Sequence, residues 1–182
     1  MKFNCLWRVL LAIFPLDIVS ADDPLAGVTQ GYFDGKRPFD AVELVGERGH
    51  ILIPESGKIE SQWVFKAGVL TASPKWDSLV TPDHYQDFRM HVEFNVNSVV
   101  DVDPEKNGNS GIYIQKRYEL QILNSHGVSE EDYKASYAGS LYRQKKPDKL
   151  VSRPAGEWQS YDIVFRAARF KDGKRTENAR IS

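Results

Sequence analysis

Hydrophobic and polar positions of this chain alternate with a period of two over several short segments. In residues 88–96 (FRMHVEFNV), every second side chain is apolar and the side chains between them are polar. Successive side chains of a β-strand point to opposite faces of its sheet, so this pattern predicts a strand with one buried and one polar face. Residues 63–70, 112–115, 118–123 and 161–165 are further strand candidates, bounded by residues typical of turns.

Helical periodicity does not persist over any long stretch of the sequence. Residues 129–137 could form one short helix, with Ser129 as its cap and Asp132 in its first turn. Many short strands with hardly any helix predict an all-β fold, a sandwich of two antiparallel sheets. Residues 178–182 look like the start of a strand that stops, so we expect a fold shortened at its carboxyl end.

Three of the predicted strands carry polar residues on one side. If these strands adjoin, one face of the sheet displays carboxylates, amides and aromatic rings, a mixture that suits sugar hydroxyls and C–H faces. A polar strand face that simply meets solvent is the alternative interpretation. The side chains expected on this face are Arg89, His91, Glu93, Asn95, Tyr113, Gln115, Glu119 and Gln121.

Glu93 and Glu119 are the two carboxylates that alternation places on this face. Cleavage of a glycosidic bond commonly uses two carboxyl groups, one as acid and one as base or nucleophile. The sequence does not give their separation, so a retaining, an inverting and a purely structural role all stay open.

No motif in the chain predicts a cofactor, and a metal site stays unknown. Residues 101–109 place oxygen ligands at alternate positions, but they fail the helix–loop–helix calcium pattern and equally suit an acidic hairpin loop. The four histidines lack zinc-ligand spacing. The net charge of -1 does not indicate nucleic acid as a partner, and we interpret the basic residues 143–149 as a solvated loop.

The first residues have the pattern of a secretory signal peptide. A positive start precedes the apolar residues 9–14, and small residues at 19–21 offer a cleavage point. We therefore expect residues 1–21 to be removed, leaving a single domain over residues 22–182 without a membrane span, secreted or periplasmic. Cys5, the single cysteine, would leave with the signal peptide.

Seven short blocks in a fixed order resemble the 3-keto-disaccharide hydrolase domain family over about residues 31–165. This resemblance implies a concanavalin-like jelly roll and action on sugars oxidised at C3, with cleavage of the glycosidic bond. A carbohydrate, a glycoside of a 3-keto-sugar, is the partner it implies. The blocks are FDGK (33–36), WVFKAGVL (63–70), YQDF (85–88), NSGIY (109–113), YELQIL (118–123), GSLY (139–142) and GEW (156–158).

The matching blocks carry the site residues that the resemblance implies. Glu119 is expected to be the base, and Glu93 its partner or a substrate ligand. Glu157 and Trp158 equally suit a turn carboxylate and a core indole. The expected substrate-binding residues are His91, Asn109, Ser110, Tyr113, Gln115, Gln121, Tyr142, Glu157 and Trp158, of which His91 and Gln115 lie outside the matching blocks and rest on alternation alone.

Two positions depart from the family pattern: Asn124 stands where Asp is usual, and Gln159 where Asn is usual. If Asn124 replaces a catalytic or metal-binding acid, the domain would bind a sugar without turning it over. A non-catalytic, lectin-like carbohydrate-binding module is therefore the alternative function.

Overall fold

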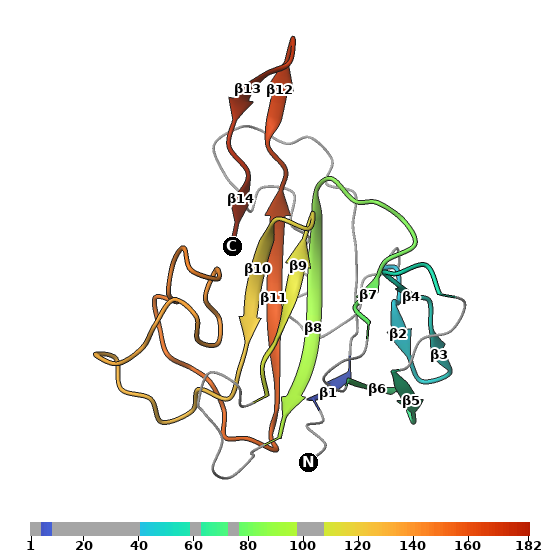
Figure 1. Cartoon of the computed structure of the whole chain (residues 1–182), viewed down its shortest axis with the longest axis vertical. Coiled ribbons are helices and arrows are strands. Elements are labelled where there is room, and N and C mark those ends of the chain that lie inside the picture. Colours follow the sequence, from blue (N-terminus) through green and yellow to red (C-terminus); the bar gives the residue numbers. More distant parts are fainter. Residues whose placement is uncertain (1–4, 9–40, 59–62, 73–76, 98–107) are drawn as a thin grey trace.

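The computed structural model of this chain consists of β-strands joined by turns and loops (Figure 1). It describes residues 5–8, 41–58, 63–72, 77–97 and 108–182, and these ranges contain no helix. The first strands are β1 (Cys5–Arg8), β2 (Val45–Gly46), β3 (Gly49–His50), β4 (Ile53–Pro54), β5 (Val64–Lys66), β6 (Val69–Ala72) and β7 (Leu79–Val80). The later strands are β8 (Phe88–Val96), β9 (Ser110–Ile114), β10 (Tyr118–Ile122), β11 (Trp158–Arg166), β12 (Arg169–Lys171), β13 (Lys174–Glu177) and β14 (Arg180–Ile181).

Six strands form one antiparallel sheet in the order β14-β11-β8-β1-β6-β5. Strand β8 coincides with the predicted strand over residues 88–96, and it pairs with β11 from Trp158 opposite Asn95 to Phe165 opposite Phe88. The backbone of β1 pairs with β8 on one side and with β6 on the other. Smaller two-stranded ribbons join β2 to β3 and β4 to β7.

Strands β9 and β10 form a hairpin that packs over the face of β8 and β11 as a second layer (Figure 1). The ring of Tyr118 on β10 lies 6.0 Å, between centroids, from that of Phe165 on β11. Apolar side chains of both layers fill the core between them, as in other sandwiches, and the predicted sandwich is confirmed. The largest fully buried apolar side chains are Phe94, Phe165, Leu44, Leu70, Ile114, Ile122 and Leu123.

The predicted strand–turn–strand over residues 63–70 is confirmed. Strands β5 and β6 are joined by Ala67 and Gly68, whose φ angles are 48° and 74°. Positive φ at both central residues is the geometry of a two-residue hairpin turn that matches the twist of its strands.

The predicted helix over residues 129–137 is wrong. Its cap does form, because the Asp132 N–H donates to the Ser129 hydroxyl at 3.2 Å. The backbone then continues in turns, and Tyr133 and Tyr137 pack edge to face with ring centroids 5.3 Å apart, beside Leu123. Burial of these two rings against the end of β10 therefore overrides the local helical signal.

Residues 178–182 do contain a strand, as predicted from their pattern. Strand β14 pairs with the end of β11, and Ser182 and Val164 exchange two backbone hydrogen bonds of 2.8 and 3.0 Å. The hairpin of β12 and β13, which extends from the end of the sheet in Figure 1, was not predicted from the sequence.

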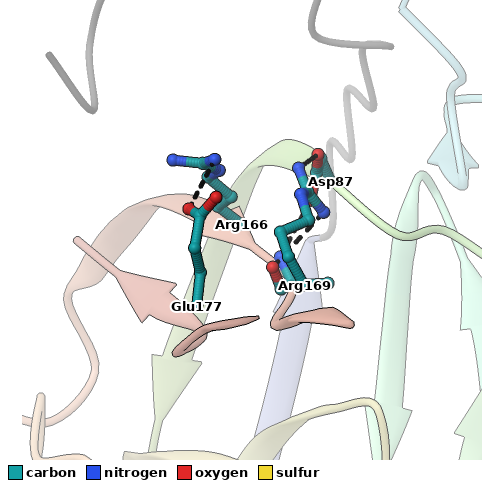
Figure 2. Close-up of polar contacts among 5 residues, drawn as sticks. Asp87, Arg166, Arg169 and Glu177 are labelled. Carbon is teal, nitrogen blue, oxygen red and sulfur yellow. Dashed lines mark hydrogen bonds and ion pairs between the residues drawn. The ribbon is translucent and has the colours of Figure 1, made fainter. Parts of the chain in front are cut away.

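One ion pair fixes the base of this hairpin to the residue before β8, and a second joins β13 to the end of β11 (Figure 2). Asp87 accepts hydrogen bonds from the Ala167 N–H at 2.8 Å and from both terminal nitrogens of Arg169. Arg166 pairs with Glu177 at 2.8 Å. Burial alone would raise the pKa of Asp87, but the hydrogen bonds from Arg169 and Ala167 and the nearby guanidinium charges outweigh it and lower that pKa.

We expect Asp87→Asn to lower the free energy of unfolding at neutral pH by about 1–3 kcal/mol, because it leaves Arg169 without its carboxylate. A lowered folded-state pKa contributes stability above the ordinary aspartate value and loses it as the pH falls through the folded value. The gap between wild type and variant should therefore shrink in acid. Urea unfolding at neutral and acidic pH measures both effects.

Glu177→Gln is the matched control, since its pair with Arg166 is more exposed and is expected to contribute less than about 1 kcal/mol. Equal losses in the two variants, or an Asp87→Asn effect that does not depend on pH, would contradict this account of the ion pairs.

Candidate functional site

The outer face of the β9–β10 hairpin presents a carboxylate held by a phenol. Glu119 on β10 lies directly opposite Tyr113 on β9, and the Tyr113 hydroxyl donates to Glu119 Oε2 at 2.8 Å. Tyr113 is 63% exposed, which is high for an aromatic side chain. The pair is therefore accessible from solvent.

Gly111 gives the Glu119 side chain its place on this face. A Cβ at position 111 would lie 2.3 Å from Glu119 Oε1, closer than any real contact. A glycine inside a strand often marks such a close approach, and here the carboxylate lies across the bare backbone of β9.

Gln121 continues the same row of β10 and is almost fully buried. Its Nε2 donates to Asn109 Oδ1 at 3.1 Å and more weakly to the Ile122 carbonyl at 3.3 Å. These bonds fix the orientation of the Gln121 amide, and the bond to Asn109 links it to the residue just before β9.

Residues 139–142 extend the face by a third row beside β10. The Gln121 N–H donates to the Ser140 carbonyl at 3.0 Å, and the Tyr142 N–H donates to the Glu119 carbonyl at 2.8 Å. Tyr142 therefore lies next to Glu119. The Arg143 guanidinium is 5.1 Å from the centre of the Tyr142 ring, which brings a positive charge to the edge of the face.

The Tyr161 hydroxyl on β11 connects this third row to the six-stranded sheet. It donates to the Gln121 carbonyl at 2.8 Å and accepts from the Gly139 N–H at 2.8 Å. The Gly139 N–H also donates to the Gln121 carbonyl at 3.0 Å. The Tyr161 hydroxyl, the Gln121 carbonyl and the Gly139 N–H therefore form one hydrogen-bonded junction. Burial raises the pKa of Tyr161, with the Gly139 N–H opposing that change, so the hydroxyl keeps its proton.

Tyr113 also keeps its proton. Desolvation, the hydrogen bond to Glu119 and the negative charge of that carboxylate together raise the pKa of Tyr113 to about 12. At neutral pH the site therefore combines a hydrogen-bonded carboxylate with a phenolic donor. A carboxylate and a phenol so placed can remove a proton and stabilise a developing oxyanion.

The expectation that Glu93 and Glu119 share one face is wrong. Strand β8 pairs with β11 and β1, whereas β9 and β10 form a separate layer over it. Glu93 alternates with Val92 and Phe94, which face the core, and therefore points out of the other side of the sandwich. His91 lies on that same outer side, where its Nδ1 is 2.8 Å from Asp162 Oδ1.

Four other predicted residues lie away from Glu119. Ser110 belongs by alternation to the row of Ile112, which packs on the core, and not to the row of Glu119. Gln115 is not on the strand face, because it lies in the turn after β9 with a φ of 52°. Glu157 is exposed in the turn before β11, and Trp158 begins β11 on the side of Glu93.

Glu119, Asn109, Tyr113, Gln121 and Tyr142 are thus the predicted site residues that the structure brings together. Sequence reasoning missed Gly111, Arg143 and Tyr161. The glycine inside the strand segment NSGIY could have indicated a close approach of another side chain, whereas Arg143 was interpreted as part of a solvated basic loop.

The described residues hold no cluster of three His, Cys, Asp or Glu side chains suited to a metal ion. Residues 101–107, the main part of the weighed calcium stretch, lie outside the described ranges.

The described residues thus form an antiparallel sandwich with a carboxylate, amides and phenols on an open face. The chain is a member of the family described as the 3-keto-alpha-glucoside-1,2-lyase-like domain, whose model matches residues 48–174. No curated protein matches the chain.

A solved structure from Parabacteroides distasonis, described as a putative glycosyl hydrolase, is similar in sequence and in fold. It is 30% identical, with a TM-score of 0.70, and the alignment covers 79% of this chain and 61% of that one. This chain therefore spans less than two thirds of the length of that structure.

We expect Tyr161→Phe to lower the free energy of unfolding by about 1–3 kcal/mol, because it removes one partner each from the Gln121 carbonyl and the Gly139 N–H. The Gly139 and Tyr142 amides should also exchange hydrogen faster, since residues 139–142 lose their tie to β11. Urea unfolding and amide hydrogen exchange measure the two effects.

Tyr118→Phe is the control, because its ring also packs on the core but its hydroxyl takes no part in the junction. Its effect should stay within about 0.5 kcal/mol. If Tyr161→Phe leaves both stability and exchange at residues 139–142 unchanged, the junction does not hold this segment.

Proposed function

We propose that this chain cleaves the glycosidic bond of sugars that carry a ketone at C3, with Glu119 as the base. The observation that carries the proposal is the Glu119 carboxylate, which lies over Gly111 and is hydrogen-bonded to Tyr113 on an open face. Membership of the 3-keto-alpha-glucoside-1,2-lyase-like family supports the same chemistry.

The proposed reaction begins at C2 of the sugar. The ketone at C3 acidifies the C2 proton, which the Glu119 carboxylate removes, and the electron pair passes to the C3 oxygen as an enolate. The C1–O bond then breaks as the C1–C2 double bond forms, and the proton taken up by Glu119 can neutralise the leaving oxygen. Water added across the double bond completes a net hydrolysis.

Phenols and a cation next to Glu119 suit the charge that develops in this step. Tyr113 stays protonated because its pKa is raised to about 12, and its single O–H, which Glu119 accepts in the free site, can turn to an enolate oxygen once Glu119 has taken up the C2 proton. Tyr142 lies beside Glu119, and the Arg143 guanidinium at the Tyr142 ring adds positive charge. Fixed donors aimed at a developing oxyanion typically contribute about 10²–10³ in rate.

We expect Glu119→Gln to lose turnover of a 3-keto-glucoside with a chromogenic leaving group by at least about 10²-fold, since an amide cannot remove the C2 proton. Binding of the same compound should persist, because the amide keeps the size of the carboxylate and one oxygen that can accept from Tyr113. Release of the leaving group and isothermal titration calorimetry measure the two separately.

Glu157→Gln is the matched control, because Glu157 is exposed in a turn away from the hairpin, and it should keep full turnover. The parent glucoside, which lacks the ketone, should not be cleaved by the wild type or by either variant. If the wild-type chain binds the 3-keto-glucoside without cleaving it, the chain is a binding module, which is the function that Asn124 in place of an acid would favour. Equal turnover in wild type and Glu119→Gln would reject Glu119 as the base.

We further propose that the protein is exported, on the pattern of residues 1–21. No helix among the described residues is long and apolar enough to cross a membrane. Removal of residues 1–21 would also remove β1, which pairs with β8 and β6, so cleavage and retention of this strand are mutually exclusive.

The amino-terminal residue of the protein recovered from an exporting bacterial host tests this proposal. Asp22 at the amino terminus of exported protein is the expected result. Intact Met1 in protein that stays inside the cell would reject export and would be consistent with β1 as a permanent strand.

A further inference from the structure

A cavity lies beside residues 139–142, apart from the open face that carries Glu119. It is an open cavity of about 450 Å³ at the edge of β11, bounded by residues 147–153. Neither Glu119 nor Tyr113 lines it. Gly139 forms part of its wall, so residues 139–142 lie between the cavity and the hairpin face that carries Glu119.

An amide donor in the wall of this cavity lacks a partner. Gln159 Oε1 accepts a hydrogen bond from the Arg153 N–H at 3.2 Å, which settles which end of the amide is oxygen. Gln159 Nε2 is buried and has no hydrogen-bond partner among the described residues. A buried N–H group without an acceptor is unfavourable, so a small shift of the Gln159 side chain that brings this donor to a ligand oxygen in the cavity would be favoured.

An exposed indole and two cations complete the lining. Trp158 precedes Gln159 on β11 and is 38% exposed, which leaves a flat ring available for stacking. Lys149 and Arg153 line the cavity, and Glu93 is the carboxylate among the described residues of its lining. Two cations against one carboxylate give these described lining residues a net positive charge.

We propose that this cavity is a second carbohydrate site, for a sugar residue that carries a carboxylate, such as a hexuronate. The sugar ring stacks on Trp158, the carboxylate faces Lys149 and Arg153, and a ring or hydroxyl oxygen accepts from Gln159 Nε2. Glu93 accepts from a sugar hydroxyl. This site goes beyond the proposed reaction and does not depend on Glu119 being a base.

Titration of the whole chain with glucuronate and, separately, with glucose tests the proposal by calorimetry. Glucuronate should bind at one site, and glucose at least about tenfold more weakly, because it lacks the carboxylate. Trp158→Ala should weaken glucuronate binding by roughly tenfold, and Lys149→Met by several-fold. Gln159→Glu, which keeps the oxygen that Arg153 needs but removes the donor, should abolish detectable binding.

Lys146→Met is the matched control, because Lys146 lies in the same basic loop but not in the lining, and it should bind glucuronate as the wild type does. Glu119→Gln should also leave this binding unchanged, which separates the cavity from the hairpin face. Circular dichroism identifies any variant that fails to fold. Lys149→Met changes only an exposed residue and so keeps the test valid if Trp158→Ala fails.

Three results would overturn the proposal. These are the absence of glucuronate binding to the wild type, equal affinity for glucose and glucuronate, and unchanged binding in folded Lys149→Met and Gln159→Glu. Loss of binding in Glu119→Gln would assign the ligand to the hairpin face and would likewise reject a second site. Failure of the 3-keto-glucoside to react, with glucuronate binding intact, would reject only the proposed reaction.

Discussion

The Tyr161 hydroxyl is the contact on which the arrangement of the site depends. A hydrogen-bonded two-stranded hairpin cannot by itself provide a third row of side chains, and residues 139–142 lie beside β10 through a few backbone hydrogen bonds and an isolated bridge rather than as a regular strand. Tyr161 extends from the six-stranded sheet through the core and satisfies the Gln121 carbonyl and the Gly139 N–H together. These two backbone groups also bond to each other at 3.0 Å, so the Tyr161 hydroxyl adds one partner to each and ties β10, the sheet and the segment together.

Everything that gives Glu119 its surroundings follows from this geometry. The segment beyond Gly139 places Tyr142 beside Glu119 and Arg143 behind the Tyr142 ring. Gly111 leaves space for the carboxylate, and Tyr113 holds it. The cavity at the edge of β11 lies against the other side of the same segment. One segment thus lies between the open face proposed for a 3-keto-sugar and the cavity proposed for an acidic sugar.

Strand positions and alternation could be predicted from the sequence because they are local properties. The limits of β8, the turn at Ala67 and Gly68, and the shared row of Glu119 and Gln121 all follow from a period of two and from turn residues. The pairing of strands is not local. The sequence does not show that β11, some sixty residues after β8, pairs with β8, or that the nearer hairpin of β9 and β10 covers the core instead. For this reason alternation alone places Glu93 and His91 on the same face as Glu119, which is wrong. Tyr161 looks like an ordinary core residue of a strand, and only its partners reveal its role.

A crystal structure of Glu119→Gln with a bound methyl 3-keto-glucoside tests the central claim most directly. The account predicts that the sugar lies over β9 and β10, with C2 facing the amide at position 119 and its C3 oxygen near the Tyr113 or Tyr142 hydroxyl. A sugar bound instead on the outer side of β8 and β11, beside His91 and Asp162, would contradict the assignment of the site to the hairpin face.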